Sequence, residues 1–153
     1  MELIQITDLV STLRRQEETI YRCEPYLSPD FQLRQGNSSL NPALNSIDGS
    51  DSSYATLRIN ECWREKICEW AYQVIDHFDF NREVVAVSLS YLDRFLCSRQ
   101  VNKKVFQLAA MTSLYMAIKL YEPNTLRVSS FIELSRGYFT VQHIIGMEET
   151  LLR

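Results

Sequence analysis

The sequence contains few of the residues that build phosphate-binding loops or metal sites. Its four glycines form no Gly-x-Gly or P-loop pattern, so a loop that cradles phosphate groups is not expected. The two histidines, His77 and His143, have no partners at ligand spacing, and the four cysteines include no Cys-x-x-Cys pair. The sequence also shows no nucleophile–base pair, so it predicts a protein without catalytic residues, metal or cofactor.

The chain also lacks a basic excess and a long apolar run. Its net charge is −3, which argues against binding to nucleic acid. The longest stretch without a charged residue is 105–118, shorter than the roughly 20 residues of a membrane-spanning helix. The first residues carry Glu2 and Asp8 without a long apolar core, so they do not form a secretory signal. We therefore expect an intracellular chain with reduced cysteines and with no nucleic-acid or membrane partner.

Three segments of different composition follow one another along the chain. Residues 1–27 keep a rough 3.6-residue apolar period and predict a helical segment. Residues 28–55 are rich in Ser, Asn, Asp and Gly, which is typical of a flexible linker. Residues 57–153 are dense in apolar side chains and predict the folded domain.

The apolar periodicity of the folded domain predicts an all-α fold with five helices. The predicted ranges are 60–78, 81–97, 102–121, 128–135 and 140–153, the last of which is cut short by the end of the chain. Three of the predicted starts carry a hydrophobic staple, in which apolar residues flank a capping residue. These staples are Phe80-Asn81 with Val85, Val101-Asn102 with Phe106, and Phe139-Thr140 with Ile144.

The third predicted helix differs from the others because it is apolar on every side. Eleven of the residues 105–118 are apolar and none is charged. A helix of this kind is surrounded by other helices. Ala109, Ser113 and Ala117 form a ridge of small side chains, which allows a neighbouring helix to approach closely. The sequence thus predicts a five-helix bundle around this segment.

Four charged residues fall on apolar helix rows or at the end of one: Arg64, Asp93, Lys119 and Glu148. An unpaired buried charge is strongly unfavourable, so a buried charge needs a partner. Long Arg and Lys side chains can instead reach water from the edge of a core, whereas the short Asp93 carboxylate cannot reach far. The signs allow Asp93 to pair with Arg64 inside the domain. Lys119 and Glu148 could pair in the same way or face a binding partner.

The same residues carry a resemblance to a known family. Residues 63–67 read Trp-Arg-Glu-Lys-Ile and are followed by Trp70, which resembles the first-helix motif of the cyclin box. The stretch Tyr-Leu-Asp-Arg-Phe-Leu at 91–96 resembles its second-helix signature. Ala-Ile-Lys at 117–119 and Met-Glu at 147–148 are similar to its third-helix and fifth-helix motifs. The resemblance implies a five-helix cyclin box, here with a preceding N-terminal helix and a flexible linker.

The resemblance also implies a role for each of the four charges. In cyclins, the positions of Arg64 and Asp93 form a buried ion pair that braces the first two helices. The positions of Lys119 and Glu148 lie on the surface that grips a cyclin-dependent kinase. The resemblance therefore implies a regulatory subunit that binds and activates a cyclin-dependent serine/threonine protein kinase in cell-cycle control. Such a subunit is not an enzyme and acts in the nucleus or the cytoplasm.

Further binding positions follow from the resemblance. Met116 and Leu120, on the same predicted helix as Lys119, are expected to belong to the kinase-binding surface. Some cyclins also dock short Arg-x-Leu peptides of substrates or inhibitors on an apolar patch of the first helix. A charged Lys66 stands where such cyclins carry an aliphatic residue, and the alternative is that both tryptophans simply pack against the core. The residues that match the peptide-docking patch are Trp63, Ile67, Trp70 and Gln107.

Two alternatives stay open on the sequence alone. A chain with this fold can instead be a scaffold or adaptor that binds a non-kinase partner, as general transcription initiation factors and retinoblastoma-type pocket proteins do. Ser28 precedes Pro29 and is either a proline-directed phosphorylation site or part of a plain turn. The turn needs no kinase, because Ser-Pro sequences favour turns by themselves.

Overall fold

The computed structural model describes residues 2–28, 30–31, 59–99, 101–124 and 126–153. Six α-helices and no strand occur within these ranges, so the predicted all-α fold class is confirmed. Of the predicted flexible linker, residues 28, 30 and 31 are described and the rest lies outside the described residues. The helices are α1 Glu2–Glu18, α3 Glu61–His77, α4 Glu83–Ser98, α5 Lys103–Tyr121, α6 Val128–Glu133 and α7 Val141–Leu151.

Asparagine side chains determine where α3 and α5 begin. The side-chain oxygen of Asn60 accepts a hydrogen bond from the Trp63 backbone N–H at 3.1 Å. The side-chain oxygen of Asn102 accepts one from the Val105 backbone N–H at 2.9 Å. The first N–H groups of a helix have no partner within the helix, so each cap satisfies a donor that would otherwise be unpaired.

The starts of α4 and α7 use different caps. Asn81 lies in a turn before α4, where its side-chain oxygen accepts from the Glu83 N–H at 2.9 Å, so this helix begins two residues later than its predicted start. At α7, Thr140 Oγ1 accepts from the His143 N–H at 3.4 Å and His143 Nδ1 accepts from the Thr140 N–H at 3.2 Å. This reciprocal pair is a capping box. The helix that it starts ends at Leu151, whereas the sequence predicted helix as far as residue 153.

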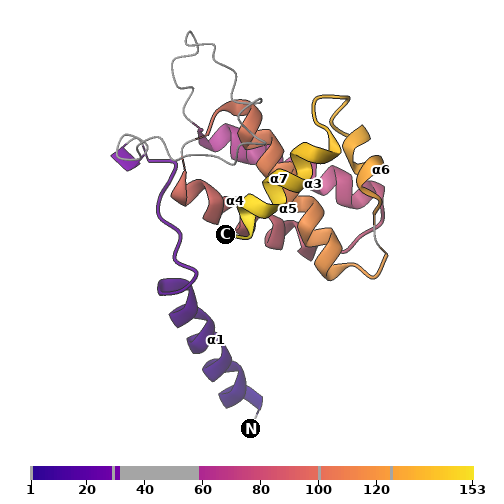
Figure 1. The fold of residues 1–153 in the computed structure, drawn as a ribbon. Helices are drawn as coiled ribbons and strands as arrows, with labels where there is room; N and C mark the ends of the chain where they lie inside the picture. The colour runs from indigo at the N-terminus through magenta and orange to yellow at the C-terminus, as the bar shows by residue number, and fades with distance from the viewer. Residues whose placement is uncertain (1, 29, 32–58, 100, 125) are drawn as a thin grey trace.

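The core of the domain is built around α5. Twelve of its residues between 105 and 118 are buried, including the small-residue ridge of Ala109, Ser113 and Ala117. This helix packs most extensively against α4 and also against α7 and α3, and Figure 1 shows it lying among these three helices. The helix that is apolar on every side is therefore the central helix of the bundle.

Aromatic side chains join the short helix α6 to this core. Phe131 of α6 is fully buried. The Tyr115 ring of α5 lies 5.3 Å from the Phe131 ring between centroids, and the Trp70 ring of α3 lies 6.5 Å from it in an edge-on arrangement. Edge-on and tilted ring pairs of this kind are favourable beyond the area that they bury. One aromatic cluster thus holds α3, α5 and α6 together.

The first helix stands apart from the bundle, as Figure 1 shows. The side chains of Ile6, Leu9, Val10 and Leu13 in α1 remain exposed. The helix ends at Glu18, so the helical segment predicted for residues 1–27 is too long. A helix rarely continues through the residue before a proline, and Pro25 follows within one to two turns.

A strap, defined as residues 21–28, connects α1 to the domain. Its Tyr26 side chain is only 7% exposed, and Leu27 packs against the hydrophobic core. The N-terminal region is therefore attached to the domain through the strap, with α1 projecting beyond it. Among the helices that the structure describes, none combines the length with the sustained apolar character that a membrane crossing requires.

Candidate functional site

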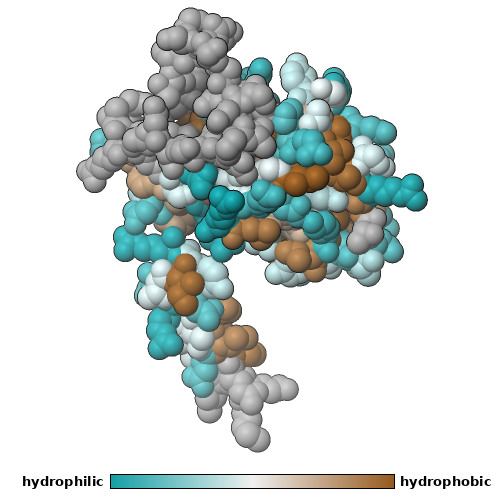
Figure 2. Space-filling model, viewed as in Figure 1, coloured by the Kyte–Doolittle hydropathy of each residue, from teal (hydrophilic) through white to brown (hydrophobic). Residues whose placement is uncertain are grey.

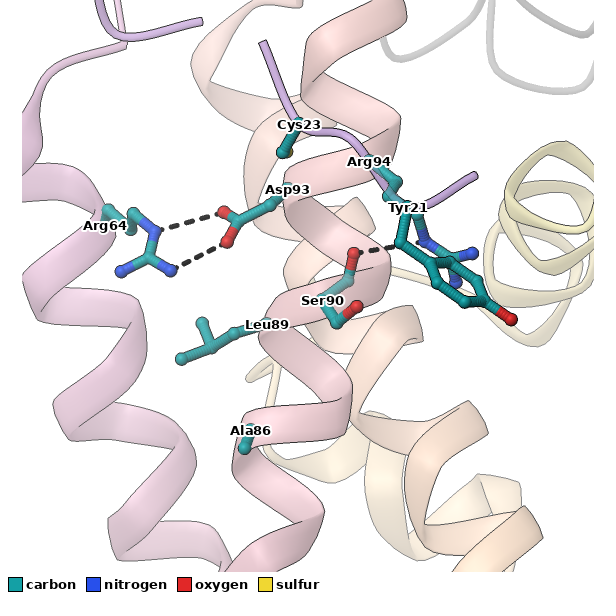
Figure 3. A pocket seen from close by; sticks show the side chains of 8 residues that line it. All are labelled: Tyr21, Cys23, Arg64, Ala86, Leu89, Ser90, Asp93 and Arg94. Atoms are coloured by element: carbon teal, nitrogen blue, oxygen red, sulfur yellow. Dashed lines mark hydrogen bonds and ion pairs between the residues drawn. The ribbon is translucent and has the colours of Figure 1, made fainter. Parts of the chain in front are cut away.

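Arg64 of α3 and Asp93 of α4 form a two-point ion pair. Arg64 Nε donates to Asp93 Oδ1 at 3.0 Å and Arg64 Nη2 donates to Asp93 Oδ2 at 2.7 Å, and Figure 3 shows the two side chains facing each other between the helices. The Arg64 side chain is 35% exposed and the Asp93 side chain 19% exposed. Two-point contacts between guanidinium and carboxylate groups are stronger and more directional than single ones. The structure therefore brings together the two residues proposed to brace the first two helices of the domain.

A third residue, Tyr26 of the strap, completes this cluster. Its hydroxyl donates a hydrogen bond to Asp93 Oδ1 at 2.6 Å. Burial raises the pKa of Tyr26 far above its ordinary value, and the hydrogen bond to the negative Asp93 raises it further. Tyr26 therefore stays a neutral donor, and one carboxylate links α3, α4 and the strap. Nothing in the local sequence pointed to Tyr26, because it lies 67 positions before Asp93.

The second charge pair joins Lys119 and Glu148. Lys119 lies in the last turn of α5 and its Nζ donates to Glu148 Oε1 in the last turn of α7. Lys119 Nζ also lies 5.4 Å from the centroid of the Tyr115 ring, within reach of a cation–π interaction. The side chains of Lys119 and Glu148 are 39% and 21% exposed, so both charges remain open to solvent. The structure shows the internal pair, one of the two arrangements that the sequence left open.

Exposed apolar side chains lie within a turn or so of Lys119 on α5 and of Glu148 on α7 and its C-cap. Ile145 on α7 lies three residues before Glu148, and Leu152, the C-cap residue of α7, lies four residues after it; both are exposed. On α5, Leu120 is 65% exposed whereas Met116 is only 5% exposed, so Leu120 offers contact area and Met116 supports the helix from the core side. Figure 2 shows hydrophobic patches along the face on which α7 lies.

The predicted peptide-docking patch is divided between core and surface. Trp63 and Trp70 are half-buried and pack against the core, and the Trp63 ring lies 5.7 Å from the Phe106 ring. Ile67 is also half-buried, whereas Gln107 on α5 is exposed. Much of both tryptophans therefore serves the core, as the alternative interpretation expected. Peptide docking at this patch stays a prediction.

Ser28 lies in a turn at the end of the strap. Its hydroxyl accepts a hydrogen bond from the Phe31 backbone N–H at 3.3 Å, and its own N–H donates to the Pro25 carbonyl at 2.8 Å. The side chain is half-buried. These contacts give Ser28 a local structural role in a turn, while its phosphorylation stays a prediction.

A hollow of about 350 Å³ opens between the strap, α3 and α4. Figure 3 shows its lining side chains, which include the Arg64–Asp93 pair. Arg94 on α4 also lines the hollow, and its guanidinium carbon Cζ lies 5.8 Å from the centroid of the Tyr21 ring and 5.3 Å from the centroid of the Tyr91 ring. Among the described residues, no group of three or more His, Cys, Asp and Glu side chains could hold a metal ion. The charged side chains that line this hollow, Arg64, Asp93 and Arg94, thus take part in contacts that join α3, α4 and the strap.

Five helices with the buried α5 at their centre, and ion pairs that join α3 to α4 and α5 to α7, define the class of this domain as an α-helical bundle. Comparison with known proteins gives the family. Residues 39–153 match the family described as "Cyclin, N-terminal domain", so the chain belongs to the cyclin family and contains a cyclin box.

Individual relatives are cyclins from plants and animals. A cyclin-A3-1 of Arabidopsis thaliana is 26% identical over 148 residues, which cover 96% of this chain and 40% of that protein. The G2/mitotic-specific cyclin S13-6 of Glycine max is 32% identical over 94 residues, or 61% of this chain and 21% of that protein. The G2/mitotic-specific cyclin-B2 of Rana japonica is 31% identical over 97 residues, which cover 63% of this chain and 25% of that protein. The chain thus spans less than half the length of these curated relatives.

Proposed function

We propose that this chain is a cyclin-type regulatory subunit that binds and activates a cyclin-dependent serine/threonine protein kinase in cell-cycle control. The observation that carries the proposal is the Lys119–Glu148 ion pair, which lies partly exposed in the last turns of α5 and α7 of a cyclin box. In cyclins, these two positions belong to the surface that grips the kinase. The chain supplies binding surface and no catalytic group, and it acts in the nucleus or the cytoplasm.

The chemistry of this surface suits a protein partner. Lys119 has three N–H donors and Glu148 two acceptor oxygens, and the contact between them uses one donor and one acceptor. The remaining groups are available to polar atoms of a kinase. Leu120, Ile145 and Leu152 add exposed apolar area around the charges. A polar centre with apolar neighbours gives a partner both hydrophobic burial and a fixed register.

Activation then follows from preferential binding. A protein kinase is active when its mobile C-helix is held inward, which completes the lysine–glutamate pair of its own active site. A rigid partner that fits only this arrangement shifts the equilibrium toward it. The Lys119–Glu148 pair joins α5 to α7, so the contact surface is already ordered before a kinase binds. The cyclin box thus changes the kinase conformation without taking part in phosphoryl transfer.

Co-purification with a panel of cyclin-dependent kinases tests the proposed surface. Lys119→Glu places two carboxylates side by side and reverses the charge offered to the kinase. We expect it to weaken binding by at least about tenfold, equivalent to about 1.4 kcal/mol. Glu148→Ala removes the other charge and is expected to weaken binding in the same direction. Far-UV circular dichroism must show an unchanged helical signal for each variant.

A charge-swapped chain separates an interface role from an internal one. Lys119→Glu combined with Glu148→Lys restores an internal ion pair of reversed orientation, and we expect this double variant to stay defective in kinase binding. Lys103→Glu serves as the matched control, because Lys103 is an exposed lysine at the first residue of α5, at the other end of the helix from Lys119. Full binding by the double variant would assign the pair to folding alone. Capture of a non-kinase partner without any kinase would favour the scaffold alternative.

A further inference from the structure

Two thiols from distant parts of the chain meet where the strap crosses α4. The Sγ atoms of Cys23 and Cys97 lie 2.9 Å apart, although the residues are 74 positions apart in sequence. Cys97 also contacts the Glu24 carbonyl oxygen at 3.3 Å, which holds its sulfur at the strap. A disulfide bond is about 2.05 Å long, so a movement of about 0.9 Å would join the two sulfurs. The two other cysteines, Cys62 and Cys68, lie on α3.

The two thiols of this pair differ in their access to solvent. Cys23 is exposed and lines the hollow between strap and helices, so a small solute can reach it (Figure 3). Cys97 is half-buried, and burial together with the neighbouring Cys23 raises the pKa of Cys97 to about 12. At neutral pH, Cys97 is therefore protonated and a poor first nucleophile. An exposed thiol beside a shielded one is the arrangement in which one cysteine reacts first and the other resolves the product.

We propose that Cys23 and Cys97 form a modification site, at which hydrogen peroxide creates a reversible disulfide between the strap and α4. The Cys23 sulfur attacks the peroxide O–O bond and becomes a sulfenic acid, releasing one water. The Cys97 sulfur then attacks the Cys23 sulfur, forms the S–S bond and releases a second water, which carries away its proton. Two electrons pass from the two thiols to the peroxide, and a dithiol reductant reverses the reaction.

This bond would change how firmly the N-terminal region is held. The strap already contributes Tyr26 to the Arg64–Asp93 cluster, and Cys23 lies three residues before Tyr26. A cross-link over 74 positions removes much freedom from the unfolded chain and keeps the strap on α4. In a reducing compartment the thiols predominate, so the bond would appear only under oxidation. The inference holds whether or not the chain binds a kinase.

Mass spectrometry of the peroxide-treated full chain tests this site. Free thiols are alkylated, the chain is digested without reductant, and the peptides are compared before and after dithiothreitol. We expect a pair of peptides joined through Cys23 and Cys97, lighter by two hydrogens and separated by the reductant. Cys23→Ser must abolish this pair, whereas Cys62→Ser, which changes another exposed thiol on α3, must leave it unchanged.

Mixed light and heavy isotope-labelled chains determine whether the bond forms within one chain. Cross-linked peptides of mixed label would overturn the proposal, and so would Cys97 joined to Cys62 or Cys68. Oxidation of Cys23 to a sulfinic acid without any cross-link would overturn it as well. Trypsin cleavage after Arg22 gives a second readout, since we expect oxidation to slow it about tenfold in the wild-type chain and not in Cys23→Ser.

Discussion

At the residue scale, Asp93 carries more contacts than its place in an apolar row suggested. Its two oxygens receive two hydrogen bonds from Arg64 and one from Tyr26. We expect Asp93→Ala to lower the free energy of unfolding by about 3 kcal/mol, because it leaves the half-buried guanidinium of Arg64 without its partner. Urea denaturation followed by circular dichroism measures this change.

The chain contains its own control for this measurement. Arg82 and Asp76 form a second two-point ion pair, with both contacts at 2.9 Å, but their side chains are exposed. Exposed ion pairs contribute little because water solvates the separated charges well. Asp76→Ala is therefore expected to change the stability far less than Asp93→Ala. Equal losses in the two variants would show that burial of the Arg64 pair has no energetic effect.

Tyr26 gives this cluster a dependence on alkaline pH. The ordinary pKa of tyrosine is about 10, and in the folded chain the pKa of Tyr26 is raised above this value by burial and by Asp93. The stability that the hydroxyl contributes is complete below pH 10 and is lost as the pH rises toward the folded pKa. At pH 8 we expect Tyr26→Phe to lower the free energy of unfolding by about 1.5 kcal/mol.

Comparison of the two chains at several pH values isolates the tyrosine. Other groups titrate in both chains and cancel in the difference, so the advantage of the wild type over Tyr26→Phe should shrink above pH 10. A difference that stays constant between pH 8 and pH 11 would contradict the hydrogen bond from Tyr26 to Asp93.

The opposite signs of Arg64 and Asp93 allowed this pairing, and the resemblance to the cyclin box implied it before the structure showed it. Tyr26 could not be predicted in the same way. A tyrosine before a linker shows no periodicity that ties it to α4, and only the path of the strap brings its hydroxyl to the carboxylate. The Cys23–Cys97 contact was missed for the same reason.

At the scale of single elements, α7 depends on its start. Thr140 and His143 form the capping box, and α7 then carries Glu148 to its place beside Lys119. We expect Thr140→Ala to lower the free energy of unfolding by about 1 kcal/mol, the usual cost of losing a side-chain cap. Thr140→Ser retains the hydroxyl and should behave like the wild type. Equal loss in both variants would show that the threonine methyl group matters more than the cap.

The strap and α1 are expected to differ in their contribution to stability. Removal of residues 1–18 deletes a helix whose apolar side chains are exposed, so we expect the urea midpoint to change little. Removal of residues 1–28 also deletes Tyr26 and Leu27 and is expected to cost about 3 kcal/mol. Equal stability of the two truncated chains would contradict the docking of the strap on the core.

Element positions in the cyclin box were largely predictable, because long amphipathic segments with polar caps have few alternatives. The apolar run of α5 and the cap at Asn102 gave that helix within a residue at either end. The predictions failed where a local contact competes with the helix. Asn81 forms a turn before α4, and the chain after Glu18 leaves the helix and brings Tyr26 into the core.

At the scale of the whole molecule, the two ion pairs have different surroundings. The Arg64–Asp93 pair lies between α3 and α4 with the strap across it, whereas the Lys119–Glu148 pair lies among exposed apolar side chains of α5 and α7. The apolar rows alone do not separate a structural pair from a surface pair, because all four charges fall on similar rows, and the distinction came from the resemblance to the cyclin box. The fold separates them through what covers each pair, and this difference underlies the proposed kinase surface.

The activity of a purified cyclin-dependent kinase, with the full chain added in increasing amounts, tests the proposed function most directly. Histone phosphorylation should rise and then saturate with the wild-type chain and with the control Lys103→Glu. With Lys119→Glu it should stay near the level of the kinase alone over the same range of concentrations. Phosphorylation that stays at the level of the kinase alone across the whole panel of kinases, even at saturating wild-type chain, would contradict the proposed role as an activating subunit.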